Sequence, residues 1–321
     1  MTVVHDAGLD SRPVRVGLDV GGTKIDAVAV SEAGEILGRL RRPTGWGEDA
    51  VVTSIVDAVN SLADEVGFPV GDVRSVGVGI PGLVDAETGR VLHAVNLGVE
   101  SLDLAARAQE IIGVPFRVEN DVKAAALGAA VLSGAAGSMA YLNLGTGVAA
   151  GIVVDGAIWR GARGTAGEVG HISVDPNGRL CGCGQRGCIE TFCGGGALAR
   201  AWGRPGALPV RDIFEAAGDG DVLASALQAD LFHGAAAAVR VLVLSADVET
   251  VIIGGGITAL GAPLENGIRA ALLADADASP FMRSLQLDAR IELLPVGSPA
   301  AAFGAAVVGA SVPEKEIVTH G

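Results

Sequence analysis

One pattern occurs twice in the chain and restricts its fold more than any other feature. An apolar, β-rich segment runs into a short turn of glycine and threonine and continues as a second apolar segment. The pattern appears at residues 14–30, around the turn 20–24, and again at 139–154, around the turn 144–147. Each copy continues into a third expected strand and then into further helices and strands. We therefore predict two duplicated α/β domains that face each other across a cleft, where ligands of open α/β sheets bind.

Hydrophobic periodicity places the expected elements. We expect a first domain over 1–120, joined by the C-terminal segment 300–321, and a second domain over 121–299. The expected strands are 14–20, 25–30, 35–42, 73–80, 115–120, 139–144, 148–154, 156–161, 250–255 and 290–296. The expected helices are 48–66, 102–113, 121–132, 190–202, 211–217, 221–245, 263–275 and 300–310.

Composition excludes several classes of partner. A formal charge of −14 argues against a nucleic-acid surface, although backbone amides can still bind phosphate in an acidic protein. The first fifteen residues lack the pattern of a signal peptide. The apolar stretch 234–244 is interrupted by Arg240 and is too short for a membrane span. We therefore expect a cytoplasmic protein without a membrane partner.

Three glycine-rich turns are candidate phosphate sites. Glycines let backbone N–H groups approach a phosphate closely, and a carboxylate beside them can hold Mg²⁺. Each turn alone also fits a simpler role, a plain hairpin or the close packing of a helix on a strand. The presence of a similar turn in both domains favours one polyphosphate held from two sides. The candidate residues are Asp19, Gly21, Gly22, Thr23, Lys24, Gly145, Thr146, Gly147, Gly254, Gly255 and Gly256.

The segment Glu119-Asn120-Asp121 lies where an expected strand meets an expected helix. Asp121 is a natural N-cap for that helix and would then need no other function. Alternatively, its carboxylate is a general base that takes a proton from a hydroxyl attacking a γ-phosphate. Asn120 beside it could then orient the same substrate.

Three of the four cysteines lie close together after a histidine. His171, Cys181, Cys183 and Cys188 form a Cys3His set with glycines between them. Four such ligands complete the tetrahedron of a structural zinc site. A disulfide pair with two uninvolved residues is the alternative, but nothing else in the sequence indicates a secreted protein.

In its ordered motifs the chain resembles the ROK family of sugar kinases and repressors, which has an actin-like, RNase H-like ATPase fold. The matching motifs are DVGGTK (19–24), GIPG (79–82), END (119–121), LGTG (144–147), GEVGH (167–171), CGCGxxGCIE (181–190) and GGGI (254–257). The resemblance implies two duplicated RNase H-like domains with a zinc-binding insertion at 171–188. It also implies that a hexose is phosphorylated by ATP with Mg²⁺.

The resemblance assigns Asp121 as the catalytic aspartate and the Cys3His set as zinc ligands. The sugar-binding residues that it implies are Gly82, Asn96, Asn120, Asp121, Glu168, His171 and Glu190. Two departures concern residues near these sites: Ala149 and Ala150 replace glycines common after the second turn, and a glutamate often found in the helix after END is absent. A third departure is that no tryptophan follows the NLG segment at 96–98, so the identity of the sugar is less well defined than the reaction.

The family also contains transcription repressors, which carry a DNA-binding domain before the first phosphate motif. Only 18 residues precede Asp19 here, so we expect a kinase rather than a sugar-responsive regulator. Glucose is the first expected substrate. A kinase for N-acetylmannosamine, N-acetylglucosamine or fructose is the alternative. We expect hexose and ATP as ligands and a homodimer or homotetramer as the assembly.

Overall fold

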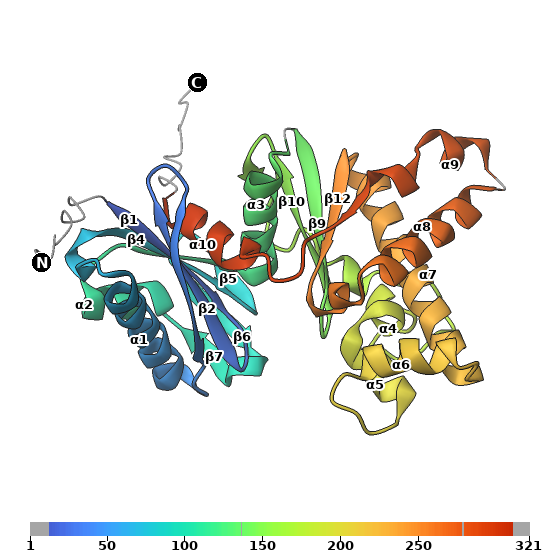
Figure 1. Cartoon of the computed structure of the whole chain (residues 1–321), viewed down its shortest axis with the longest axis horizontal. Helices are drawn as coiled ribbons and strands as arrows, with labels where there is room; N and C mark the ends of the chain where they lie inside the picture. The colour runs from blue at the N-terminus through green and yellow to red at the C-terminus, as the bar shows by residue number, and fades with distance from the viewer. Residues whose placement is uncertain (1–12, 136, 278, 311–321) are drawn as a thin grey trace, which may run out of the picture. The chain divides into compact units, whose positions relative to one another are not determined.

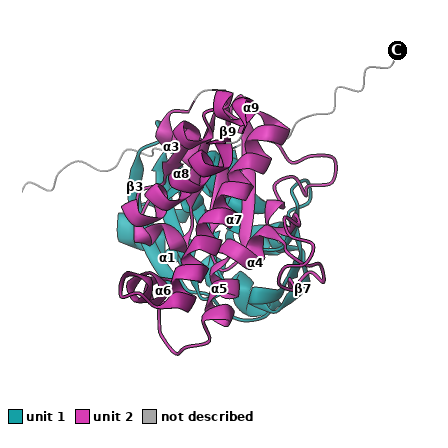
Figure 2. Cartoon of the chain, turned by 90° about the vertical axis from the view of Figure 1, so that its right-hand side faces the viewer, with its two compact units in different colours: residues 1–128, 299–321 teal, residues 129–298 magenta. Residues whose placement is uncertain are grey.

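The computed structural model describes residues 13–135, 137–277 and 279–310. The chain divides into two compact units, Met1–Gly128 with Pro299–Gly321, and Ala129–Ser298 (Figure 2). The second domain expected from the sequence starts at Asp121, whereas unit 2 starts at Ala129, within helix α3 (Asp121–Ser133). The expected C-terminal segment beyond residue 310 lies outside the described residues.

Unit 1 contains a five-stranded sheet in the order β3-β2-β1-β4-β8. Its strands are β1 (Val14–Val20), β2 (Lys24–Ser31), β3 (Ile36–Pro43), β4 (Val73–Ile80) and β8 (Phe116–Asn120). Strand β2 pairs antiparallel with both β3 and β1, and β1, β4 and β8 run parallel to one another. The carboxyl ends of the three parallel strands therefore meet at one edge of the sheet.

Unit 2 repeats this plan in a second five-stranded sheet, ordered β11-β10-β9-β12-β13. Its strands are β9 (Ser138–Leu144), β10 (Val148–Val154), β11 (Ala157–Ile158), β12 (Thr250–Gly254) and β13 (Ile291–Leu293). The order and directions match those of unit 1, so the predicted duplication is confirmed. The strands expected at 156–161 and 290–296 are much shorter, because only two and three residues pair with a neighbour.

Helices cover both faces of the first sheet (Figure 1). Helix α1 (Glu48–Val66) buries the predicted apolar face and packs with α2 (Leu104–Ile112) on one side. Helix α10 (Ala300–Ala310) packs on the other side, against Val28 and Val30 of β2. It lies so close to the strands that a Cβ on Gly17 or Gly77 would overlap its backbone carbonyls. Glycine at these two strand positions therefore permits the approach.

The helices of unit 2 share one apolar core with its sheet. They are α4 (Ile189–Cys193), α5 (Gly195–Trp202), α6 (Pro209–Gly218), α7 (Val222–Ala246), α8 (Ala262–Asp277) and α9 (Pro280–Ser284). The single helix expected over 190–202 is in fact two helices. Gly194 between them has extended backbone, with φ −76 and ψ 132, so the chain changes direction there.

A small antiparallel sheet in unit 1 was not predicted from the sequence. It consists of β5 (Leu83–Asp85), β6 (Arg90–Ala94) and β7 (Val99–Leu102). It directly follows the turn at Gly82, and Asn96 lies between its last two strands. Two of the expected sugar-binding residues, Gly82 and Asn96, therefore adjoin this sheet.

One helix in the described part of the chain, α7, is long and apolar enough by length and composition to cross a membrane. Half of its most apolar window is buried within the molecule, as in the core helix of a globular protein. The sequence argument considered only residues 234–244, whereas the helix has 25 residues, so its length does not exclude a span. Arg240 within it pairs with Asp275 at 2.9 Å.

Candidate functional site

The first group of site residues lies at the carboxyl edge of the unit 1 sheet. The strand register places Asp19 beside Gly79, and Gly79 beside Glu119. A Cβ on Gly79 would lie 3.2 Å from the Cβ of Ala124 in α3, a tight contact, and 3.4 Å from the Cα of Asp121. The absence of a side chain at Gly79 therefore lets helix α3 start close to the strand ends, which brings Asp121 to the same edge as Asp19.

The first glycine turn exposes backbone amides at this edge. The N–H of Gly21 donates to the carbonyl of Lys24 at 2.9 Å and closes the turn. Gly22 and Thr23 are exposed, and their N–H groups make no hydrogen bond with any other described residue. Two amides and the exposed Lys24 side chain can therefore contact an anion here.

The turn also contacts a predicted sugar-binding residue. A Cβ on Gly22 would lie 2.9 Å from the carbonyl oxygen of Asn96, so glycine is needed for this approach. On the other side, the N–H of Thr44 donates to the carbonyl of Thr23 at 3.1 Å. The hydroxyl of Thr44 is buried and has no hydrogen-bond partner among the described residues. The turn and Asn96 thus form one continuous surface of unit 1.

Asn120, rather than Asp121, caps helix α3. Its Oδ1 accepts hydrogen bonds from the N–H groups of Val122 and Lys123, at 3.1 and 3.3 Å. Its Nδ2 donates to the carbonyl of Gly82 at 3.4 Å. Asp121 Oδ1 also accepts a hydrogen bond from the N–H of Val122, at 2.9 Å. Helix α3 nevertheless begins at Asp121, so the N-cap position belongs to Asn120 and the expectation that Asp121 is the N-cap is wrong. Asp121 lies in the first turn of α3.

Two carboxylates influence each other at this edge. Burial raises the pKa of Asp19 to about 7, and the charge of Asp121 raises this pKa as well. Lys24 acts in the opposite direction and lowers it. Burial and the second carboxylate together disfavour the ionised form of Asp19, and a bound cation would favour it.

The second glycine turn, in unit 2, is held by its carbonyl groups. The carbonyls of Gly145 and Thr146 accept hydrogen bonds from the N–H groups of Gly195 and Gly196, at 2.8 and 2.9 Å. Because a trans peptide is planar, its N–H points opposite to its C=O. The N–H groups of Thr146 and Gly147 therefore point away from α5, and neither donates to another described residue.

The third glycine patch has a packing role, which the sequence left open beside ligand binding. Register places Gly254 beside Asn143, at the same edge as the second turn. A Cβ on Gly254 would overlap the ring of Tyr141, and one on Gly255 would overlap the carbonyl of Leu144. Only at Gly256 is the space around a Cβ open.

Strand β10 positions the segment that contains Glu168 and His171. The N–H of Ala150 donates to the carbonyl of Gly167 at 2.7 Å. A Cβ on Gly167 or Gly170 would overlap carbonyls of β10, so both glycines are required for this contact. Glu168 is exposed between them, and His171 follows in a short 3₁₀ turn, Val169–His171.

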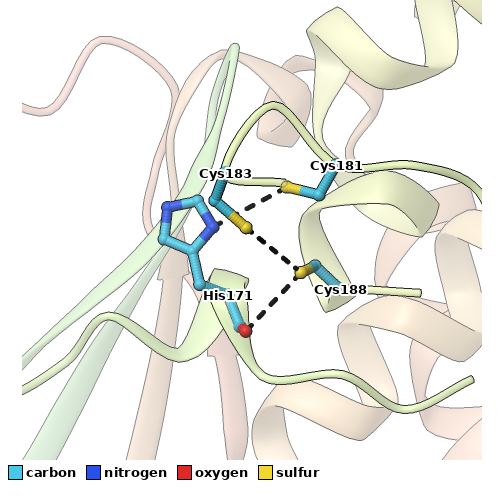
Figure 3. A group of neighbouring side chains, drawn as sticks. All are labelled: His171, Cys181, Cys183 and Cys188. Atoms are coloured by element: carbon cyan, nitrogen blue, oxygen red, sulfur yellow. Dashed lines mark hydrogen bonds between the residues drawn. The ribbon is translucent and has the colours of Figure 1, made fainter. Parts of the chain in front are cut away.

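The four predicted metal ligands converge (Figure 3). Their ligand atoms all lie within 4.8 Å of one another, and the cysteines are free thiols. The Sγ atoms of Cys183 and Cys188 are 3.7 Å apart, and Cys181 Sγ is 3.8 Å from His171 Nδ1. Two thiolates bound about 2.3 Å from one tetrahedral zinc lie about 3.8 Å apart, so the geometry fits a zinc ion.

The thiols of this cluster differ in their surroundings. A hydrogen bond from the backbone N–H of Gln185 lowers the pKa of the exposed Cys183 thiol. Burial raises the pKa of the Cys188 thiol. The remaining cysteine, Cys193, lies in the core of unit 2, where burial raises its pKa, as expected for a residue outside the metal set.

Two structural features of the site were not found in the sequence. Gly195 and Gly196, in a run of three glycines, hold the second turn, and Glu190 accepts a hydrogen bond from the N–H of Val148 at 3.0 Å. The three consecutive glycines were a visible signal for the first. Nothing in the sequence indicates the second, because the two residues are 42 positions apart.

An exposed tryptophan also lies beside the Asn96 segment. The N–H of Gly47 donates to the carbonyl of Leu97 at 2.7 Å. A Cβ on Gly98 would lie 2.6 Å from the Trp46 ring, which is 70% exposed. Trp46 therefore occupies the surface next to the segment that lacks the family's tryptophan.

Two sheets of one plan, each with a glycine turn at its carboxyl edge, define an actin-like ATPase fold. Residues 15–308 match the ROK family, and the chain belongs to this family. A glucokinase of Halalkalibacterium halodurans is 34% identical over 276 residues, which cover 79% of this chain and 83% of the relative. An N-acetylmannosamine kinase of Yersinia pseudotuberculosis is 31% identical over 252 residues, or 75% and 82% of the two chains.

The solved structures agree with this assignment. The structure of a ROK family glucokinase from Streptomyces griseus in complex with glucose and AMPPNP has a TM-score of 0.76 and 30% sequence identity to this chain. The match covers 92% of this chain and 99% of the glucokinase.

Proposed function

We propose that the protein transfers the γ-phosphoryl group of ATP to a hydroxyl of a hexose, with glucose as the preferred sugar. The similarity to glucokinases over most of the chain supports this reaction. The observation that carries it is the grouping at one edge of unit 1. There, the carboxylates of Asp19 and Asp121 accompany a turn with open amides.

Asp121 is the general base of the proposed reaction. Its carboxylate takes the proton of the attacking hydroxyl as the bond to phosphorus forms. Asn120 caps α3, so the cap does not depend on the hydrogen bond that Asp121 Oδ1 accepts from the N–H of Val122. Asn120 and Asn96 bind sugar hydroxyls at the same edge, together with the backbone at Gly82.

The glycine turns bind the phosphates of ATP. The amides of Gly22 and Thr23 and the ammonium of Lys24 contact phosphate oxygens from unit 1. The amides of Thr146 and Gly147 do so from unit 2, and Gly254 to Gly256 border the nucleoside. Asp19 would hold Mg²⁺ directly or through water, and the bound ion would supply positive charge to the phosphate oxygens.

His171 and the three cysteines would hold a structural zinc ion, which would stabilise the fold of the segment. His171 directs Nδ1 toward Cys181, so Nε2 remains for a sugar hydroxyl. Metal ligation fixes the orientation of the imidazole ring and the position of its second N–H. Glu168 and Glu190 complete the proposed set of sugar-binding residues.

An N-acetylhexosamine kinase is the second candidate, since an N-acetylmannosamine kinase is 31% identical to this chain. The sequence motifs are also compatible with a fructokinase of the same family and with a regulator without turnover. The decisive experiment measures ADP release with MgATP and a panel of hexoses. We expect the highest kcat/KM for glucose. A higher value for an N-acetylhexosamine would favour the second candidate, and no ADP release with any sugar would contradict the proposal.

Two further predictions accompany this function. The four free thiols agree with a reducing cytoplasm as the location. The homodimer or homotetramer expected from the sequence stays a prediction, and light scattering on the purified protein would determine the assembly.

A further inference from the structure

A carboxylate two residues after the metal ligand Cys188 binds the backbone next to the second glycine turn. Oε2 of Glu190 accepts a hydrogen bond from the N–H of Val148 at 3.0 Å. A Cβ on Gly147 would lie 2.6 Å from the same oxygen, so the turn and the half-buried carboxylate are in direct contact. The carboxylate thus engages the first amide of β10.

The residues that follow Glu190 hold the other side of the turn. The N–H groups of Gly195 and Gly196 donate to carbonyls of the turn, at 2.8 and 2.9 Å. A Cβ on Gly195 would lie 2.9 Å from the oxygen of Gly145, so this contact requires glycine. One short segment, 190–196, therefore determines which way the peptide groups of the turn face.

The same segment begins at the metal cluster. Cys188 lies two residues before Glu190, and the N–H of Ile189 donates to the carbonyl of Ile172 at 3.0 Å, next to His171. Ligation of Cys188 and His171 by one ion would fix both sides of this contact. Helix α4 would then start from a fixed point and present Glu190 to the turn.

We propose that Glu190 is a positioning residue for the nucleotide, which holds the second turn so that the amides of Thr146 and Gly147 face the phosphates. The inference rests on the proposed function, in which this turn binds ATP. It extends the proposed role of Glu190 from the sugar to the nucleotide. A role of Glu190 confined to the sugar would leave nucleotide affinity unchanged.

The test measures the Kd of Mg-AMPPNP by calorimetry without any sugar. Glu190→Ala removes the acceptor, and we expect the Kd to rise roughly tenfold, the usual effect of losing a hydrogen bond to a charged group. Glu190→Gln keeps an oxygen for the Val148 amide and should bind nearly as the wild type does. Glu168→Ala is the matched control, because it removes the other proposed sugar carboxylate without touching the turn.

Wild-type affinity in Glu190→Ala would overturn the proposal, and so would equal weakening in Glu168→Ala. If Glu190→Ala does not fold, as judged by its melting curve, wild-type affinity of a folded Glu190→Asp variant would overturn the proposal instead. That carboxylate is one methylene short of Val148, so weaker binding is expected. Removal of zinc from the wild type by a chelator should also raise the Kd.

The same measurement separates this proposal from the proposed function. Wild-type nucleotide binding without hexose turnover would contradict the kinase activity but leave the role of Glu190 standing. Failure of the wild type to bind Mg-AMPPNP would overturn both.

Discussion

Asp121 can be tested as the general base, because the neighbouring residue Asn120 is the cap of helix α3. Asn120 caps α3, and asparagine at position 121 keeps an Oδ1 that can accept from the N–H of Val122, so Asp121→Asn should leave the helix intact. We expect the variant to fold and bind glucose but to lose roughly 10²–10⁴-fold in kcat, the usual contribution of a positioned base. Steady-state kinetics and a glucose titration check this prediction. Near-normal turnover would show that Asp121 has only a structural role.

Asp19 should make folding stability depend on pH. Burial raises its pKa from 3.8 to about 7, so the folded chain disfavours the ionised form. Its contribution to stability is then greatest below about pH 4 and is lost as the pH rises to about 7. In the nucleotide-free chain at about pH 8, Asp19→Asn should therefore raise the free energy of unfolding by on the order of a few kcal/mol, because the variant has no carboxylate to ionise there.

Denaturant titrations at about pH 4 and about pH 8 test this dependence. The difference in unfolding free energy between variant and wild type should shift toward the variant at the higher pH. The same variant should turn over MgATP poorly. An equal difference at both pH values would mean that the Asp19 carboxyl titrates normally.

Single residues could be assigned a role from the sequence where their type and spacing alone indicate that role. The histidine and three cysteines could be chosen as metal ligands because glycines separate them within eighteen positions. The choice between Asn120 and Asp121 as helix cap could not be made, because both residue types suit that position. The contact between Glu190 and Val148 depends on the tertiary fold.

At the scale of elements, the metal segment should behave as one folding unit. We expect about one zinc per chain, lost in Cys183→Ser. Because a structural zinc contributes folding energy, this variant should also melt at a lower temperature. Metal analysis and thermal unfolding check both results, with Cys193→Ser as a control that keeps the four ligands. Metal-free protein purified without chelator would contradict the site.

Elements were predictable where their pattern is long. Helix α1 was identified because four apolar residues repeat at helical spacing, and all four are buried: Val51, Ile55, Val59 and Leu62. The strands β5, β6 and β7 were missed because runs of three to five residues carry little periodicity. The break at Gly194 was missed because the apolar residues on both sides fit one helix.

At the scale of the whole molecule, unit 1 depends on a helix from the far end of the chain. A Cβ on Gly77 would overlap the carbonyl of Ala305 in α10, so Gly77→Ala must displace that helix. We expect the variant to lose about 1–3 kcal/mol of stability or more, as overpacked cores do. Gly71→Ala is the matched control, because nothing lies within 4 Å of the added atom. Equal melting temperatures for the two variants would contradict this account.

The position of α10 also has a consequence for the order in which the protein is made. Unit 1 is completed only by Pro299–Gly321, after all of unit 2 has been synthesised. Until α10 leaves the ribosome, the glycine-lined face of the first sheet has no partner and exposes Val28 and Val30. Nascent chains with such an uncovered sheet are prone to associate with one another. A ribosome stalled before residue 299 would therefore present a natural target for chaperones.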